Sequence, residues 1–138
     1  MYARAAVAVD RQPIEAPGAP AAIGPYSHAV RAGSLLFCSG QIPLDPSSGE
    51  LLGETAAQQA HQCLTNLTAV CEAAGASLSD AVRLTVYMTD LSAFAEVGQV
   101  YATFFGDSPP ARVAVGVVAL PRGAQVEIDA VVALPQSI

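Results

Sequence analysis

The sequence contains no lysine and no tryptophan among its 138 residues. All six of its basic side chains are arginines. Without a lysine amine the protein cannot hold a carbonyl substrate as a Schiff base, and it cannot attach pyridoxal phosphate in the usual covalent way. Covalent catalysis that depends on lysine is therefore excluded.

Charge of either sign is scarce, since charged residues make up 13% of the chain against the usual quarter. Twelve acids and six arginines give a net charge of −6, and no basic run occurs. An acidic protein repels a phosphate backbone, so nucleic-acid binding is disfavoured. Hydrophobic residues make up 52%, which is enough for a core, and the shortage of charge favours burial of some surface in an oligomer.

Cysteine is also sparse. Cys38, Cys63 and Cys71 are odd in number and form no C-x-x-C pair, so neither a disulfide framework nor a zinc site is indicated. The two histidines, His28 and His61, lack metal-ligand spacing. Free thiols are typical of a reducing compartment, and no apolar run is long enough for a signal sequence or a membrane span. We expect a cytoplasmic protein with no metal and no membrane partner.

Two segments have the periodicity of amphipathic helices. The first begins after Thr55, which forms a capping-box pattern with Gln58, and ends at Gly75, a residue type that favours helix C-termini. The second begins near Ser92 and ends at Gly106. Their apolar positions are Ala60, Cys63, Leu64, Leu67, Val70, Cys71 and Ala74 in the first, and Phe94, Val97, Tyr101, Phe104 and Phe105 in the second.

Short apolar or alternating runs predict strands at residues 28–32, 35–39, 82–88, 113–119 and 125–133, with a further candidate at 5–9. Residues 12–25 and 43–53 are interpreted as loops. The last two strands are predicted to pair as a hairpin. This order of elements predicts one α+β domain over residues 1–138, with a mixed β-sheet and two helices packed on one face, so that the other face needs cover.

Two charged residues are candidates for chemistry. Glu127 shares a strand face with Asp129, opposite the hydrophobic face, so it points to solvent or to a partner subunit; a lone strand carboxylate is most often simply solvated. Arg112 begins the preceding strand, where it either lies on the surface or binds a carboxylate through two parallel hydrogen bonds. If the two strands form a hairpin, Arg112 and Glu127 are neighbours, and such a pair is most often an ordinary ion pair.

Two turns offer further candidates. Tyr26, in a turn ahead of a strand, is either a lid or ordinary packing. Ser39 and Gly40 end a strand, where bare backbone N–H groups either face a ligand or form a tight turn. No histidine and aspartate pattern accompanies Ser39, so a catalytic triad is not supported.

Six segments in the right order resemble the reactive intermediate deaminases, the RidA/YjgF family. The resemblance covers about residues 13–133. The segments are residues 23–27 (IGPYS), 39–43 (SGQIP), 72–78 (EAAGASL), 85–90 (TVYMTD), 110–112 (PAR) and 120–128 (LPRGAQVEI).

The resemblance implies a chorismate-mutase-like fold and a homotrimer with ligand sites between subunits. It also implies hydrolysis of reactive enamines and imines, such as 2-aminoacrylate, to 2-oxo acids and ammonium without a cofactor. Carried over to this chain, Arg112 would hold the substrate carboxylate and Glu127 would activate the attacking water. Arg112 would share the substrate-binding pocket with Tyr26, Ser39, Gly40, Gly98 and Ala114.

The chain also departs from the family. The family usually has Asn where this chain has Gly98, often Cys in place of Ala114, and usually Gln in place of His28; residues 1–12 form an atypical N-terminal extension. The alternative function is a non-catalytic trimer that binds small carboxylate metabolites, which would need Arg112 but not Glu127. An RNA-acting protein is disfavoured by the charge, and a chorismate mutase rests on fold analogy alone.

Overall fold

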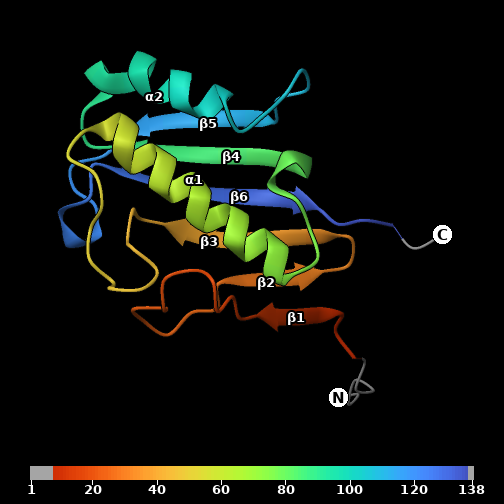
Figure 1. Ribbon diagram of the computed structural model, residues 1–138. Coiled ribbons are helices and arrows are strands. Elements are labelled where there is room, and N and C mark those ends of the chain that lie inside the picture. The colour runs from red at the N-terminus through yellow and green to blue at the C-terminus, as the bar shows by residue number, and fades with distance from the viewer. Residues whose placement is uncertain (1–7, 137–138) are drawn as a thin grey trace, which may run out of the picture.

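Residues 8–136 are described in the computed structural model, and they form a six-stranded sheet with two helices packed on one face (Figure 1). The spatial strand order is β1-β2-β3-β6-β4-β5. Neighbouring strands are antiparallel except β4 and β5, which are parallel, so the sheet is mixed as predicted. The strands are β1 Arg11–Ile14, β2 Ala29–Ala32, β3 Leu35–Gln41, β4 Ala81–Met88, β5 Ala111–Gly116 and β6 Val126–Ala133.

The longer helix, α1, spans Ala56–Ala73, and its ends are those that the sequence predicts. The Thr55 hydroxyl accepts a hydrogen bond from the Gln58 N–H, and the Gln58 side chain accepts one from the Thr55 N–H, which completes the capping box. Gly75 follows the C-terminus with φ of +73°, a left-handed conformation that glycine adopts without strain.

The shorter helix, α2, spans Phe94–Ala102 after a 3₁₀ turn at Leu91–Ala93. It ends before the predicted boundary at Gly106, because the chain turns at Thr103 and Phe104. Two further 3₁₀ turns lie at Leu78–Asp80 and Pro121–Gly123. Within residues 8–136, no helix combines the length and the apolar character needed to cross a membrane.

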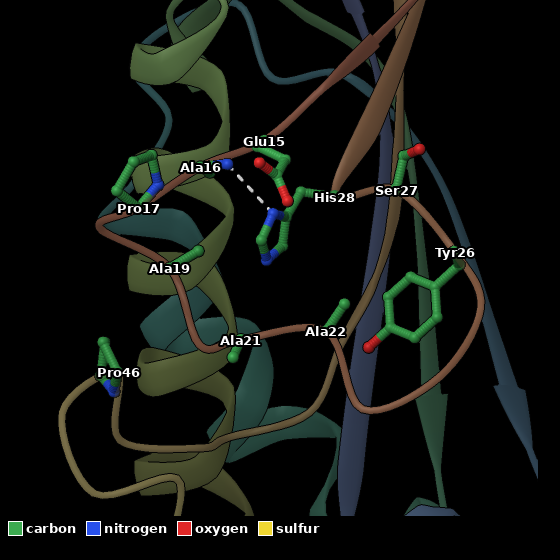
Figure 2. Close-up of a pocket in the computed structure, with 10 residues that line it drawn as sticks. All are labelled: Glu15, Ala16, Pro17, Ala19, Ala21, Ala22, Tyr26, Ser27, His28 and Pro46. Atoms are coloured by element: carbon green, nitrogen blue, oxygen red, sulfur yellow. Dashed lines mark hydrogen bonds between the residues drawn. The ribbon is translucent and has the colours of Figure 1, made fainter.

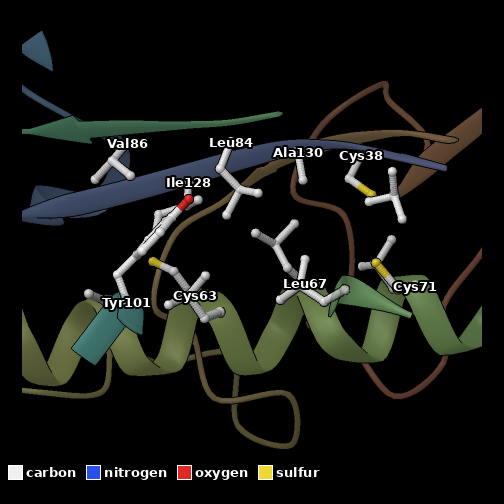
Figure 3. Packing of buried hydrophobic residues seen from close by; sticks show 14 of the residues in the cluster. Cys38, Cys63, Leu67, Cys71, Leu84, Val86, Tyr101, Ile128 and Ala130 are labelled. Atoms are coloured by element: carbon white, nitrogen blue, oxygen red, sulfur yellow. The ribbon is translucent and has the colours of Figure 1, made fainter. Parts of the chain in front are cut away.

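The core lies between the helices and the sheet. Figure 3 shows Cys63 and Leu67 of α1 directed at Leu84 of β4 and at Ile128 and Ala130 of β6. Alternate residues of β6 are buried, as its period-2 pattern predicts. On the opposite face of the sheet neither helix packs, and Phe37, Val113 and Val115 are exposed there.

The predicted hairpin is wrong. β4 lies between β5 and β6 and pairs with both, so the last two strands are not neighbours. The β-branched runs identified both strands, but apolar content does not specify which strand pairs with which. The chain leaves β4, passes through α2 and returns as the parallel strand β5, the usual role of a helical crossover.

Three smaller differences concern the N-terminal region and β4. Residues 12–14, interpreted as loop, belong to β1. β1 is an edge strand, where Pro13 is tolerated because its missing N–H leaves no hydrogen bond to a further strand unmade. The candidate strand at 5–9 falls mostly outside the described residues. The alternation of residues 82–88 predicts that Val82 shares the buried face of Leu84. Val82 is instead 49% exposed, because the register between β4 and β6 shifts between Ala81 and Arg83.

Candidate functional site

An irregularity in β3 places Glu127 against bare backbone. Cys38 pairs with Ala130 and Gln41 with Ile128, so one extra residue of β3 lies between these pairs, at Ser39 and Gly40. The Glu127 side chain crosses this bulge. A Cβ atom at Gly40 would overlap Glu127 Oε2 and lie 3.0 Å from Glu127 Cδ. Glycine is therefore required here for the carboxylate to keep its position.

The Glu127 carboxyl group is half-buried, and burial raises its pKa, with a further contribution from the negative charge of Asp129. Within the described residues it forms no ion pair. A carboxyl group whose pKa is moved toward neutrality by desolvation can both accept and return a proton.

The carboxylate opens into a cavity of about 330 Å³. This volume is at the small end of the range for ligand pockets. The structure thus brings together four of the predicted residues, Tyr26, Ser39, Gly40 and Glu127, with an apolar wall that the sequence did not indicate. That wall consists of Ile23, Ile42 and Pro121.

Ser39 has a structural part in this wall. Its hydroxyl donates a hydrogen bond of 2.6 Å to the Ser27 carbonyl, and its N–H donates one of 3.0 Å to the His28 carbonyl. The hydroxyl proton is therefore engaged with the backbone of the loop that carries Tyr26. Ser39 holds the loop to the bulge, which agrees with the absence of a triad pattern.

Arg112 lies on the other face of the sheet. Its guanidinium carbon is 5.0 Å from the ring centroid of Phe94 and 5.4 Å from that of Tyr101, both from α2. Rings at this distance hold a cation through their negative faces. Among residues 8–136 Arg112 forms no ion pair, so its charge is free for an anionic ligand. Gly98 and Ala114 line the same small recess.

The side chain of Tyr101 lies beside Arg112 and is buried. The Tyr101 hydroxyl is buried without a hydrogen-bond partner in the described part of the chain. Burial raises the pKa of Tyr101, while the charge of Arg112 acts in the opposite direction. The ring of Tyr101 lines the recess beside Arg112, whereas its hydroxyl contacts no polar group in the described residues.

The two candidate groups do not meet within one chain. Arg112 pairs in register with Leu84, which faces the helices, whereas Glu127 pairs with Tyr87, on the open face. The expectation that they are neighbours on a hairpin is therefore wrong, and β4 separates them. Each chain presents two half-sites, one with Glu127, Gly40 and Tyr26 and one with Arg112, Gly98 and Ala114.

Sequence reasoning missed the hydrogen bond between Tyr87 and Asp129 on the open face. The Tyr87 hydroxyl donates to Asp129 Oδ2 at 3.0 Å, and burial together with this bond raises the pKa of Tyr87. The alternation of β4 and β6 placed both residues on this face, and only the strand order, which the sequence did not provide, sets them side by side. Asp129 in turn adds to the field that acts on Glu127.

The remaining titratable side chains form no further centre. No group of three or more His, Cys, Asp or Glu side chains in residues 8–136 could hold a metal ion. All three thiols are buried, and burial raises the pKa of Cys63. Cys38 and Cys71 point toward each other in the core (Figure 3), as expected for cysteines that pack as small hydrophobes.

This chain is similar to several known proteins over nearly its whole length. The Endoribonuclease L-PSP family matches residues 16–134. The RutC family protein y4sK of Sinorhizobium fredii is 51% identical over 123 residues, which cover 89% of this chain and 98% of that protein. The 2-iminobutanoate/2-iminopropanoate deaminase of Mus musculus is 46% identical, over 88% of this chain and 90% of that protein. The crystal structure of E. coli TdcF with bound serine superposes with a TM-score of 0.85 at 40% identity, over 90% and 99% of the two chains.

Proposed function

We propose that this chain, which belongs to the Endoribonuclease L-PSP or RidA/YjgF family, hydrolyses small reactive 2-imino and 2-enamino acids to 2-oxo acids and ammonium. The observation that carries the proposal is the position of Glu127, a half-buried carboxylate of raised pKa held over Gly40 at the mouth of a small cavity. Relatives named for this reaction, at 43–46% identity, support it.

The complete site forms between two copies of the chain. Arg112 and Glu127 lie on opposite faces of one sheet, so a single chain cannot bring both to one small substrate. The open face exposes Phe37, Val113 and Val115, apolar side chains that a second copy would cover. A closed ring of three copies, in which each Glu127 half-site meets the Arg112 half-site of its neighbour, satisfies both requirements.

Arg112 binds the substrate carboxylate. The guanidinium can donate two parallel hydrogen bonds, and the rings of Phe94 and Tyr101 fix its plane. Because Arg112 has no carboxylate partner within the described residues, binding does not require an ion pair to be broken first. Fixing the substrate carboxylate orients the neighbouring C2 carbon toward the attacking water.

Glu127 moves the proton. As the carboxylate, it accepts a proton from water while the water oxygen attacks C2 of the protonated imine, which gives a carbinolamine. As the acid, it returns that proton to the nitrogen. As the C–N bond breaks and the C=O bond forms, Glu127 takes the hydroxyl proton of the carbinolamine and passes it to the departing ammonia, which gives the 2-oxo acid and ammonium. One imine and one water are consumed, and Glu127 ends ionised as it began. A positioned acid and base of this kind accelerates a reaction about 10²–10⁴-fold.

The test is the decay of 2-aminoacrylate, generated in place by a serine dehydratase, with wild type, Arg112→Ala and Glu127→Ala. We expect wild type to speed the release of 2-oxo acid and ammonium and both variants to lose this effect. If wild type binds small carboxylates at Arg112 but does not speed the decay, the protein is a carboxylate-binding protein and the deaminase proposal is wrong.

A further inference from the structure

The loop between β1 and β2 is held in place by the buried side chain of His28. The ring is 7% exposed, and both of its nitrogens are engaged with loop backbone. Nδ1 accepts a hydrogen bond of 3.0 Å from the Ala16 N–H, and Nε2 lies 2.8 Å from the Pro20 carbonyl oxygen. Figure 2 shows the ring inside the loop, with Tyr26 at the far end of the same segment.

These two contacts define the protonation state of the ring. An amide N–H can only donate and a carbonyl oxygen can only accept, so Nδ1 must be bare and Nε2 must carry the proton. His28 is therefore a neutral imidazole in this arrangement. A protonated ring would present an Nδ1–H to the Ala16 N–H, two donors facing each other, and the bond to Ala16 would be lost.

The position of Tyr26 depends on this loop. Tyr26 is 43% exposed, and its hydroxyl accepts one hydrogen bond, of 3.3 Å, from Ile23 of the same loop. The C-terminal end of the loop is tied to the β3 bulge by the two bonds that Ser39 donates to Ser27 and His28. Within residues 8–136, the His28 ring is the one side chain that forms hydrogen bonds to the N-terminal half of the loop.

We propose that His28 is a positioning residue for the reaction: its neutral ring fixes the segment from Ala16 to Ser27 and so holds Tyr26 in the wall of the Glu127 cavity. The proposal rests on the proposed function. It adds a residue that does not line the Glu127 cavity, since His28 faces the other side of the loop, toward a separate space of about 560 Å³ lined by Glu15, Ala16 and Pro46 among others.

The charged and titratable neighbours of the ring are few. Glu15, on the same loop, is the one charged residue among those that line this space, and it is exposed. Asp45, next to Pro46, accepts a hydrogen bond from the Ser47 N–H. On β3, Cys38 stays a neutral thiol, because its hydrogen bond with Cys71 and burial raise its pKa. From α1, Ala69 packs near Gly18 of the loop.

The test compares His28→Gln with His28→Leu. A glutamine amide offers one acceptor and one donor and does not titrate, whereas leucine fills space and offers neither. We expect the Ala16 amide to exchange with deuterium roughly tenfold faster in His28→Leu than in wild type, and near the wild-type rate in His28→Gln.

Activity supplies the second readout. His28→Leu is expected to raise KM for the imine several-fold with a smaller change in kcat, and His28→Gln to restore the wild-type KM. The Tyr26 ring protons, followed by NMR, report the loop without substrate and should shift only in His28→Leu, so failure of the deaminase proposal leaves this arm intact. Equal Ala16 exchange in all three proteins, or unmoved Tyr26 resonances in His28→Leu, would overturn the positioning role.

Discussion

The surroundings of Glu127 raise the pKa of its carboxyl group. Burial is the larger cause of the raised pKa and the negative charge of Asp129 is the smaller one. Within the described residues no cation pairs with Glu127 to lower its pKa. The same features carry a cost in stability, since an ionised carboxylate is desolvated in the folded state. The proton transfer that we propose for Glu127 and folding stability therefore make opposite demands on this residue.

Glu127→Gln separates the two effects. Because the pKa of Glu127 is raised in the folded state, stability is lost as the pH rises through that pKa and recovered below the unfolded value. Glutamine cannot ionise, so the variant should have the higher Tm at pH 7 and no advantage below about pH 4. Its kcat should fall about 10²–10⁴-fold. Thermal melts from pH 4 to 8 and measurements of kcat check both effects. The control is Glu72→Gln, at an exposed position of α1. A Tm of Glu127→Gln below that of wild type at pH 7 would contradict the prediction.

Gly40 is expected to be essential for geometry rather than for folding. A methyl group at this position would push the Glu127 carboxylate from its place, and a displacement of about 1 Å can cost about 100-fold in rate. We expect Gly40→Ala to lower kcat/KM by roughly 10- to 100-fold while the Tm changes little, because a side-chain end can move. Gly106→Ala, where nothing lies within 4 Å of the added methyl, is the control and should match wild type in both measurements.

Tyr101 should contribute its ring but not its hydroxyl. Tyr101→Phe keeps the ring over Arg112 and removes a buried oxygen that has no partner in residues 8–136, so it should raise stability by about 1 kcal/mol and leave KM unchanged. Tyr101→Leu loses the ring and should raise KM. Urea unfolding and steady-state kinetics distinguish the variants. A rise in KM with Tyr101→Phe would instead assign the hydroxyl to the substrate.

At the scale of elements, the sequence predicted which segments form helices and strands, but it did not predict which strands are neighbours in the sheet. Helix caps and strand periods are local, and so the first helix and the outward face of Glu127 follow from neighbours in the chain. Strand order is non-local. Nothing in the two C-terminal runs shows that β4 lies between them, and so the sequence could not reveal that Arg112 and Glu127 are separated.

The capping box of α1 offers a test at this scale. Thr55→Ala removes the hydroxyl that accepts from the Gln58 N–H, and we expect a loss of about 1 kcal/mol in the free energy of unfolding. Thr65→Ala is the matched control, since Thr65 is exposed within the same helix, where alanine is the better helix former. Urea unfolding midpoints of both variants test this prediction. If Thr55→Ala is as stable as wild type, the capping box does not contribute to the free energy of unfolding.

At the scale of the whole molecule, the two faces of the sheet differ in what covers them. Both helices cover one face (Figure 1) and bury the core. The other face carries Glu127 with the exposed Phe37, Val113 and Val115. The need for cover on this face followed from the predicted element order. In the proposed assembly a second copy covers this face and brings its Arg112 to Glu127, and neither contact can be read from the sequence of one chain.

Subunit mixing tests that assembly. Arg112→Ala and Glu127→Ala should each be inactive alone. When they are mixed and allowed to exchange subunits, about one quarter of the interfaces should pair an intact Glu127 with an intact Arg112, and about a quarter of wild-type activity should return. The double variant mixed with either single variant should recover nothing, because no interface then holds both groups. Native mass spectrometry must show mixed oligomers; if it does and activity stays absent, the site does not form between subunits. Recovery would instead explain why Arg112 and Glu127 are separated in each chain, because the sheet that keeps them apart also directs each toward a different neighbour.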